Sequence, residues 1–435
     1  MKILIKNVDI VTMNEQNQVY ERSNIVIEDN IITHIGDIGD IGDIDINKVD
    51  YEIEGLNKLA MPGLINCHTH LGMSLFRNYA DDMILSEWLT KKIWPAEAKL
   101  IAEDIYWASL LSMSEMIASG TTTFCDMYFF MDQVIKALDI SGMRASLARG
   151  IVEEDSNSIY KIEENEKLFI EHNDSLNGRI KIMFGPHAPY TCSPEFLLKI
   201  MDSASKLNAS LHIHLSETKK EVEESFRKYN KSPIKHMYDL GLFDLHTVAA
   251  HCVHIDEEDI KLIKEKNVHP VNNPSSNFKL ASGFSPVNKM LKEGIKVALG
   301  TDGAASNNNL NMFKEISMAS IVNKAVDNDP MSVTALEALN MATINGAYAL
   351  GLEKEIGSLE IGKKADIIIL DMDKPHLCPR NNIYSTLAYS AYGSDVDTVI
   401  VDGNILMERK EFKTIDIEKV KYMVKVNSMD LLNNR

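Results

Sequence analysis

Short apolar segments alternate with amphipathic segments through the middle of the chain, between about residues 59 and 356. Each apolar segment has the length of a buried strand, and the intervals carry helix-start signals such as Ser193-Pro194. Helices are expected over 86–93, 104–118, 193–206 and 257–266. Eight strands are expected, over 64–70, 122–127, 143–150, 180–185, 210–215, 248–252, 268–272 and 297–301.

This alternation predicts an α/β protein whose strands lie parallel, because each helix carries the chain back to the start of the next strand. Eight such units over about 250 to 300 residues are typical of a (β/α)8 TIM barrel. The alternative is an open, doubly wound sheet, but no Gly-x-Gly-x-x-Gly sequence follows an early strand. Residues 59–356 are therefore expected to form the barrel domain.

The two ends of the chain, 1–58 and 357–435, share a different pattern of short strand-like segments separated by turns. Examples are Ile3–Ile5, Asn24–Ile27 and Val396–Val401, the last followed by Asp402-Gly403, a hairpin-turn pair. Because the two ends match in pattern, they are predicted to form one small β-sandwich domain. The Gly-Asp-Ile repeat within 35–44 has the composition of a loop or hairpin tip.

Composition narrows the functional classes. The net charge of -18 over 435 residues argues against a nucleic-acid partner, since phosphate binding requires a basic surface. No uncharged apolar stretch reaches the length of about 18 residues needed to cross a membrane, and the first residues lack a signal-peptide core. The five cysteines are scattered and are expected to be buried thiols. We expect a cytoplasmic protein without a membrane partner, either monomeric or a homo-oligomer.

Imidazoles and carboxylates gather where the predicted strands end, which in a barrel is the rim that holds the active site. His68 and His70 are two residues apart on one strand and so point to the same side. Alone, this pair is equally compatible with two solvated histidines. An unpaired Asp302 at the same rim would cost several kcal/mol, which a cation would offset. A metal site is therefore predicted, and the other residues at these strand ends are His187, His214, Glu217 and His251. His212 is expected to be a packed inner residue, and His254 a helix-start residue.

Five motifs stand out in the chain: Pro-Gly-Leu-Ile-Asn-Cys-His-Thr-His, His-Leu-Ser-Glu, Ala-His-Cys-Val-His, Asn-Pro-Ser-Ser-Asn and Leu-Gly-Thr-Asp-Gly-Ala. Together they resemble the amidohydrolase superfamily. More narrowly, over nearly its whole length the chain is similar to the deaminases of 5'-methylthioadenosine and S-adenosylhomocysteine. The resemblance implies that a metal-activated water replaces the adenine amino group, giving the inosine analogue and ammonia, with adenosine as a further candidate substrate.

The resemblance also implies a set of residue roles. One divalent ion per subunit, expected to be Zn²⁺, is bound by His68, His70, His214 and Asp302. His187 ends the strand where two-metal relatives have a modified lysine, which favours a single ion. Asp302 accepts a proton from the attacking water, Glu217 protonates a ring nitrogen of the substrate, and His251 positions the water.

For a nucleoside substrate, the resemblance implies that Glu97 binds the ribose hydroxyls, His187 the purine ring and Arg149 the substrate tail. Glu217 and Asp302 also contact the reacting ring. Lys161 stands where some relatives have arginine and offers a point charge instead of a bidentate fork, which puts tight binding of a carboxylate tail in doubt. Leu71, Met73, Trp88 and Trp94 are candidate walls of a thioether pocket. The alternatives are hydrolysis of another heterocycle, such as guanine, a pterin or a triazine, and a non-catalytic metal-binding scaffold.

Overall fold

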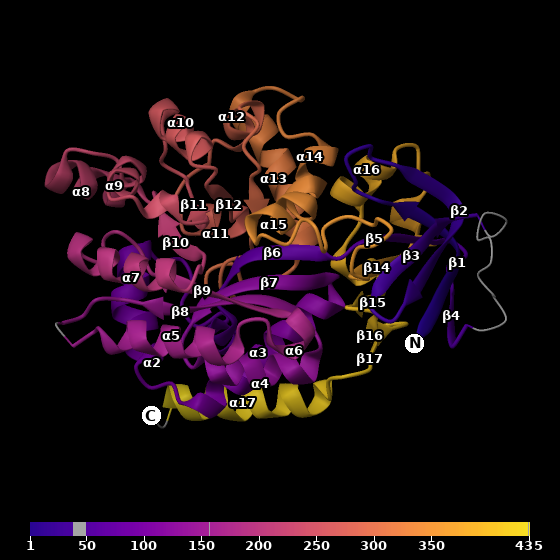
Figure 1. Ribbon diagram of the computed structural model, residues 1–435, viewed down its shortest axis with the longest axis horizontal. Coiled ribbons are helices and arrows are strands. Elements are labelled where there is room, and N and C mark those ends of the chain that lie inside the picture. The colour runs from indigo at the N-terminus through magenta and orange to yellow at the C-terminus, as the bar shows by residue number, and fades with distance from the viewer. Residues whose placement is uncertain (38–48, 156, 434) are drawn as a thin grey trace.

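The computed structural model describes residues 1–37, 49–155, 157–433 and 435. Eight parallel strands form a nearly closed barrel surrounded by helices, and strands from both chain ends form a separate mixed sheet (Figure 1). The predicted (β/α)8 barrel is thus confirmed. The Gly-Asp-Ile repeat lies mostly in 38–48, outside the described residues, so its expected loop is untested.

Each predicted barrel strand is present, and neighbours in the sequence are neighbours in the barrel. The last strand is shorter than predicted because the chain turns toward the first strand after Leu299. There the backbone N–H of Asp302 donates to the carbonyl of His68 over 2.9 Å, which links the two edges. The strands are β6 (Leu64–Thr69), β7 (Thr121–Tyr128), β8 (Arg144–Ile151), β9 (Ile180–Pro186), β10 (Leu211–Leu215), β11 (Thr247–His251), β12 (His269–Asn272) and β13 (Ala298–Leu299).

The helices around the barrel begin largely where the sequence signals predict. Ser193 caps α7 by accepting the N–H of Phe196 over 3.2 Å, directly before Pro194. The helices are α3 (Ala102–Ala118), α4 (Met131–Ser141), α5 (Tyr160–His172), α6 (Ser175–Gly178), α7 (Pro194–Lys206), α8 (Lys219–Tyr229), α9 (Pro233–Asp239), η5 (Leu242–Asp244), α10 (Glu257–Glu265), α11 (Pro274–Lys279), α12 (Val287–Lys292), α13 (Met312–Asp327), α14 (Ala335–Met341) and α15 (Ile344–Ala349).

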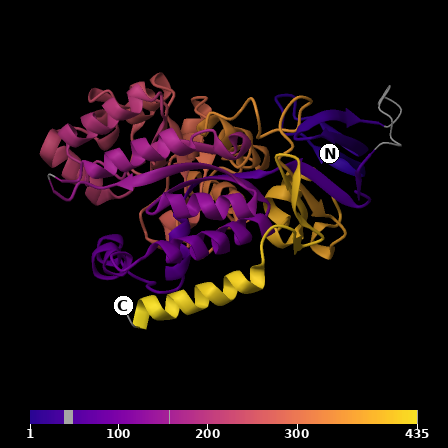
Figure 2. The same cartoon turned by 60° about the horizontal axis from the view of Figure 1, so that its bottom comes forward.

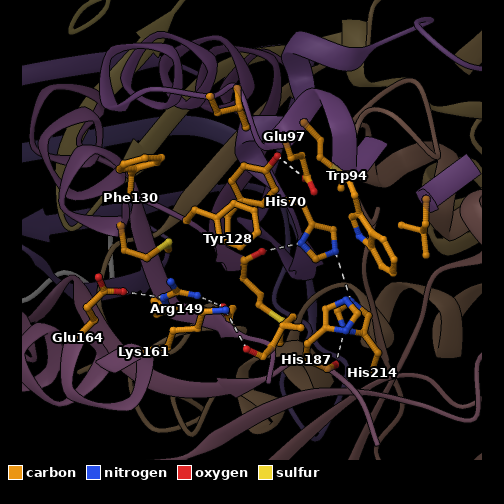
Figure 3. A pocket seen from close by; sticks show the side chains of 18 of the residues that line it. His70, Trp94, Glu97, Tyr128, Phe130, Arg149, Lys161, Glu164, His187 and His214 are labelled. Carbon is orange, nitrogen blue, oxygen red and sulfur yellow. Dashed lines mark hydrogen bonds and ion pairs between the residues drawn. The ribbon is translucent and has the colours of Figure 1, made fainter. Parts of the chain in front are cut away.

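The segment after β6 departs from the single helix predicted over 86–93. A 3-10 turn, η3 (Leu71–Phe76), is followed by α1 (Leu85–Trp88), a π-helical turn η4 (Leu89–Ile93) and α2 (Trp94–Glu97). Irregular turns of this kind are frequent at functional sites. Here they carry Glu97 to the rim of the barrel (Figure 3).

The terminal strands form one mixed sheet of nine strands, in the order β17-β16-β15-β14-β5-β1-β2-β3, with β4 beside β1. β5 lies between β1 and β14, so the sheet extends past residue 58 to Pro62 before the barrel begins. The strands are β1 (Lys2–Val11), β2 (Val19–Glu28), β3 (Ile31–Gly36), β4 (Tyr51–Glu54), β5 (Lys58–Pro62), β14 (Ile367–Asp371), β15 (Val396–Val401), β16 (Asn404–Glu408) and β17 (Glu411–Phe412). The short helical turns nearby are η6 (Pro375–Leu377), α16 (Ile383–Ser385), η7 (Thr386–Ser390) and η8 (Gly393–Asp395).

A buried ion pair and a packed helix are among the contacts that attach the chain ends to the barrel. The buried Arg144 of β8 donates from Nε and Nη2 to the Asp366 carboxylate over 2.9 and 3.1 Å. The final helix, α17 (Ile417–Asn433), runs along the outside of the barrel against α3 (Figure 2).

None of the described helices is long and apolar enough to cross a membrane. All five cysteines are free, but Cys378 is exposed on a loop of the terminal unit, so the expectation that all are buried was wrong.

Candidate metal-binding active site

Four imidazoles and one carboxylate converge at the carboxyl ends of β6, β10, β11 and β13. His68 Nε2 and His70 Nε2 lie 3.5 and 3.3 Å from Asp302 Oδ1. His214 Nε2 lies 3.4 Å from His70 Nε2. The potential ligand atoms of His68, His70 and His214 all lie within 4.8 Å of one another, as do those of His68, His251 and Asp302. All five side chains are buried.

The outer ring nitrogens of these histidines are held by the surrounding chain. His70 Nδ1 lies 2.6 Å from the carbonyl of Met127, and His214 Nδ1 lies 2.7 Å from the carbonyl of His187. A carbonyl only accepts, so each Nδ1 carries a hydrogen, and the inward-facing Nε2 is the atom available to a metal ion. His68 Nε2 is buried and has no hydrogen-bond partner among the described residues. A cation bound between these atoms would satisfy it, so the donor set fits a divalent metal ion.

The protonation states of these side chains also suit the binding of a divalent metal ion. Burial lowers the pKa of His68 to about 3 and holds the pKa of His214 well below its usual value, so both rings are neutral ligands at neutral pH. Burial opposes ionisation of Asp302, but the neighbouring imidazoles of His68 and His70 hold its pKa well below the usual range. Burial would also lower the pKa of His70, yet Asp302 raises it to about 9. The carboxylate therefore attracts positive charge to the point where the Nε2 atoms meet.

The backbone around this point adopts conformations that L-residues rarely take. Ser216, His251 and Asp302 have φ angles of 51, 75 and 61°, in the left-handed region. A Cβ atom on Gly300 would lie 2.8 Å from the Cβ of His68, so only glycine lets β13 approach β6 this closely. Three serine and glycine groups also donate to the Asp302 carboxylate: Gly303 N–H over 2.7 Å, Ser276 Oγ over 2.6 Å and Ser306 Oγ over 3.0 Å.

Glu217 faces this cluster from the end of β10. Its Oε2 lies 3.9 Å from Nε2 of His251, and burial raises its pKa, which favours the protonated acid. The following helix, α8, begins at Lys219 and is capped by Thr218, so Glu217 lies outside the helix and is not part of its first turn. His251 Nδ1 lies 2.9 Å from Oδ1 of Asn277, which orients its ring.

A cavity of about 920 Å³ opens from this cluster (Figure 3). The structure brings Glu97, Arg149, His187 and Lys161 to its walls, together with His70, His214, Glu217, His251 and Asp302. Trp88, Trp94 and Met73 also line it, whereas Leu71 does not. His254 stays outside, bonded through Nε2 to the carbonyl of Ser282 over 2.6 Å.

The far end of the cavity carries paired charges. Arg149 Nε donates to Glu164 over 2.9 Å, and Lys161 Nζ lies 3.0 Å from Glu154 Oε1 and 2.9 Å from the carbonyl of Val152 (Figure 3). The resemblance to relatives implies the two cations but not their carboxylate partners, which lie on α5 (Glu164) and in the loop before it (Glu154).

Tyr128 is a further cavity residue, not predicted from the sequence. Its hydroxyl donates to Glu97 Oε1 over 2.6 Å. Tyr128 ends β7, one residue past the strand predicted over 122–127, so its position at a strand end was the available signal. The residues predicted for the site at strand ends were imidazoles and carboxylates, so the phenol of Tyr128 was not among them.

Residues 59–406 match the amidohydrolase family model. The chain belongs to the amidohydrolase family. Over 99% of its length it is 59% identical to the whole of a 5-methylthioadenosine/S-adenosylhomocysteine deaminase from Thermoanaerobacter pseudethanolicus.

Two solved structures share this fold. An adenosine deaminase from Xanthomonas campestris with bound zinc matches at a TM-score of 0.94 and 31% identity, covering 99% of this chain and 98% of that one. An atrazine chlorohydrolase from Arthrobacter aurescens complexed with zinc matches at a TM-score of 0.90 and 23% identity, covering 99% of this chain and all of the other. At that identity the second likeness supports the fold alone.

Proposed function

We propose that this amidohydrolase deaminates 5'-methylthioadenosine and S-adenosylhomocysteine to their inosine analogues, releasing ammonia. The observation that carries the proposal is the shared cavity, which joins the cluster around Asp302 to the Glu97–Tyr128 pair and to Arg149. A cavity that joins these three groups matches a substrate with a reacting ring, a diol and a tail. The names of its relatives, a methylthioadenosine/S-adenosylhomocysteine deaminase and an adenosine deaminase, support the same substrate class.

One zinc ion, bound by His68, His70, His214 and Asp302, is the proposed cofactor. Such an ion lowers the pKa of a bound water from 15.7 towards about 7 and so supplies a nucleophile at neutral pH. The single-ion assignment rests on β9, which ends in Pro186 before His187 and offers no lysine at the rim, while Lys181 pairs with Asp174 on the exposed side.

Different side chains carry out the separate proton transfers of the reaction. Asp302, held ionised by its neighbours, accepts a proton from the attacking water. Glu217, whose pKa is raised by burial, delivers a proton to a ring nitrogen and makes the attacked carbon electron-poor. Having lost its proton to the ring, Glu217 takes the second proton of the attacking water from the newly added hydroxyl and passes it to the departing amine, which leaves as ammonia. His251, oriented by Asn277, hydrogen-bonds the attacking oxygen.

The remaining cavity residues position the substrate. Glu97 offers a carboxylate oxygen to the ribose diol, and His187 hydrogen-bonds the purine. Burial lowers the pKa of His187 to about 4, so its ring is neutral and suited to a neutral base. Arg149 and Lys161 lie where the tail would end. Their pairing with Glu164 and Glu154 leaves them partly neutralised, which favours the uncharged methylthio tail or a zwitterionic tail over a simple anion.

The test is ammonia release by zinc-reconstituted protein on 5'-methylthioadenosine, S-adenosylhomocysteine, adenosine, guanine and a chlorotriazine. We expect kcat/KM to be highest for the two thioether nucleosides. Higher turnover of guanine or the triazine would favour the alternative heterocycle hydrolase, and no turnover on the whole panel by metal-loaded protein would favour a non-catalytic scaffold.

A further inference from the structure

His212 lies two residues before His214 on β10 and is fully buried. Its Nε2 lies 2.9 Å from Nδ1 of His68, and its Nδ1 lies 3.3 Å from Sγ of Cys125. Cys125 Sγ in turn lies 3.9 Å from Sδ of Met183. A chain of four buried side chains thus runs from the candidate ligand His68 through β10 and β7 to β9.

His68 differs from the other two histidine ligands in how its ring is held. The Nδ1 atoms of His70 and His214 face backbone carbonyls, which only accept, so the tautomers of those rings are fixed by the fold. His68 Nδ1 faces another imidazole, whose nitrogen can donate or accept. His68 can therefore bind a metal ion through Nε2 only when the hydrogen bonds along this series of four side chains all run in one direction.

We propose that His212 and Cys125 are positioning residues that set the tautomer of His68 required for metal binding. In the competent direction, His68 Nδ1–H donates to His212 Nε2, and His212 Nδ1–H donates to Cys125 Sγ. The Cys125 S–H then points to Met183. In the reverse direction, His212 donates to His68, whose hydrogen moves to Nε2, the atom that faces Asp302 and would bind the metal.

The four side chains are neutral in both arrangements of their hydrogen bonds. The two arrangements therefore differ in the tautomers of the imidazoles and not in net charge. Cys125 and His212 are both fully buried, where an unpaired charge would be costly, so both side chains stay neutral. Cys125 also belongs to neither group of side chains that could hold a metal. Its contribution is as an acceptor for His212, whose Nδ1–H would otherwise be buried without a partner.

This inference rests on the metal site of the proposed function. It is tested by measuring zinc affinity in competition with a chromophoric chelator, using full-length protein. We expect His212→Leu, which removes the acceptor, to weaken zinc binding by about 10- to 100-fold, and His212→Gln, which retains an acceptor oxygen, to recover much of that loss. His269→Leu is the matched control: His269 is also a buried barrel histidine, on β12, but it contacts no candidate ligand in the described structure. It should leave zinc affinity unchanged.

A second pair of variants covers the case in which His212→Leu does not fold. Cys125→Ala should weaken zinc binding several-fold and Cys125→Ser, with a hydroxyl acceptor, should restore it. Cys192→Ala, at a buried thiol that bonds the carbonyl of Ile151, is the control for lost volume. Cobalt-substituted protein gives an independent readout, because a changed His68 ligation alters the visible spectrum of the bound ion.

The outcomes separate the two proposals. Wild-type protein that binds no divalent metal would overturn the proposed function. Tight wild-type binding that is unchanged in the His212→Leu and Cys125→Ala proteins, with an unchanged cobalt spectrum, would overturn the role of His212 and Cys125 alone. Equal losses in these variants and in the His269 and Cys192 controls would show a packing effect and would also overturn it.

Discussion

The hydroxyl of Tyr128, at the end of β7, donates a hydrogen bond to Oε1 of Glu97, at the end of α2, over 2.6 Å. Among the described residues, no hydrogen-bond donor contacts the other oxygen, Oε2. Tyr128 therefore fixes the carboxylate and leaves one oxygen to face the cavity. A carboxylate held in this way is suited to two neighbouring hydroxyls, which is why the pair supports a ribose site.

Tyr128→Phe is expected to raise KM for nucleosides with an intact diol by about 5- to 10-fold, which corresponds to the loss of one hydrogen bond worth about 1 kcal/mol. kcat and zinc content should change little, because Tyr128 does not contact the reacting ring in the proposed site. The measurement is steady-state kinetics on adenosine and 2'-deoxyadenosine in parallel. An equal rise of KM for both substrates would show that Tyr128 acts on another part of the nucleoside.

Glu221 positions the proposed acid Glu217 through the backbone. The buried carboxylate of Glu221 accepts the N–H of Ser216 over 2.9 Å and that of Glu217 over 2.8 Å. Glu221→Gln replaces one acceptor oxygen by a donor and so turns one of these bonds into a clash of hydrogens. We expect kcat to fall by up to about 100-fold, the cost of a displaced catalytic group, with KM and zinc affinity nearly unchanged.

The control is Glu224→Gln on the solvent side of the same helix, where Glu224 pairs only with Lys220 in the described structure. It should match the wild type in kcat. A loss of zinc binding in Glu221→Gln would contradict the assignment, since it would place the effect at the ligand His214.

Arg144 is the buried cation that joins the barrel to the terminal sheet. Its side chain and that of Asp366 are each 2% exposed. Arg144→Met would leave the Asp366 charge buried without its partner, and we expect a loss of about 3 to 5 kcal/mol in the free energy of unfolding. Urea unfolding measures this loss. The double variant Arg144→Met/Asp366→Asn should regain part of it, and a double variant no more stable than the single one would argue against an uncompensated charge.

The sequence was sufficient to predict the barrel and the converging residues, because both depend on strand periodicity. His68, His70, His214 and Asp302 end strands whose apolar runs are visible in the sequence, and parallel strands bring their carboxyl ends to one rim. The helix over 86–93 was harder to predict. It is interrupted by a π-helical turn, which the pattern of apolar and polar residues does not indicate.

Contacts between side chains from distant strands could not be predicted. His212 was expected to be packed inside, and it is buried, but its bond to His68 Nδ1 joins residues 144 positions apart. Tyr128 and Glu97 meet across two segments whose relative placement follows from the tertiary structure. Sequence patterns give the position of a residue along its own element, whereas these partners depend on how the elements pack.

The environment of Asp259 leads us to expect that the free energy of unfolding depends on pH. Asp259 lies in the first turn of α10, where its Oδ2 accepts the N–H of Asp256 over 3.3 Å and its Oδ1 accepts the hydroxyl of Ser232. Burial raises its pKa from 3.8 to about 6. The folded protein therefore holds this proton more tightly than the unfolded chain. The stabilising contribution of the protonated form is complete below about pH 4 and is lost as the pH rises through about 6.

Asp259→Asn keeps an acceptor and a neutral side chain at every pH, so it removes this titration. We expect the wild type to lose about 1 to 2 kcal/mol of unfolding free energy relative to the variant between pH 4 and pH 7, after allowance for partial solvent access. Urea unfolding of both proteins at matched pH gives the difference, in which pH effects common to both, metal binding included, cancel. A difference that stays constant over this range would show that Asp259 does not titrate there, and would place its pKa near the ordinary value.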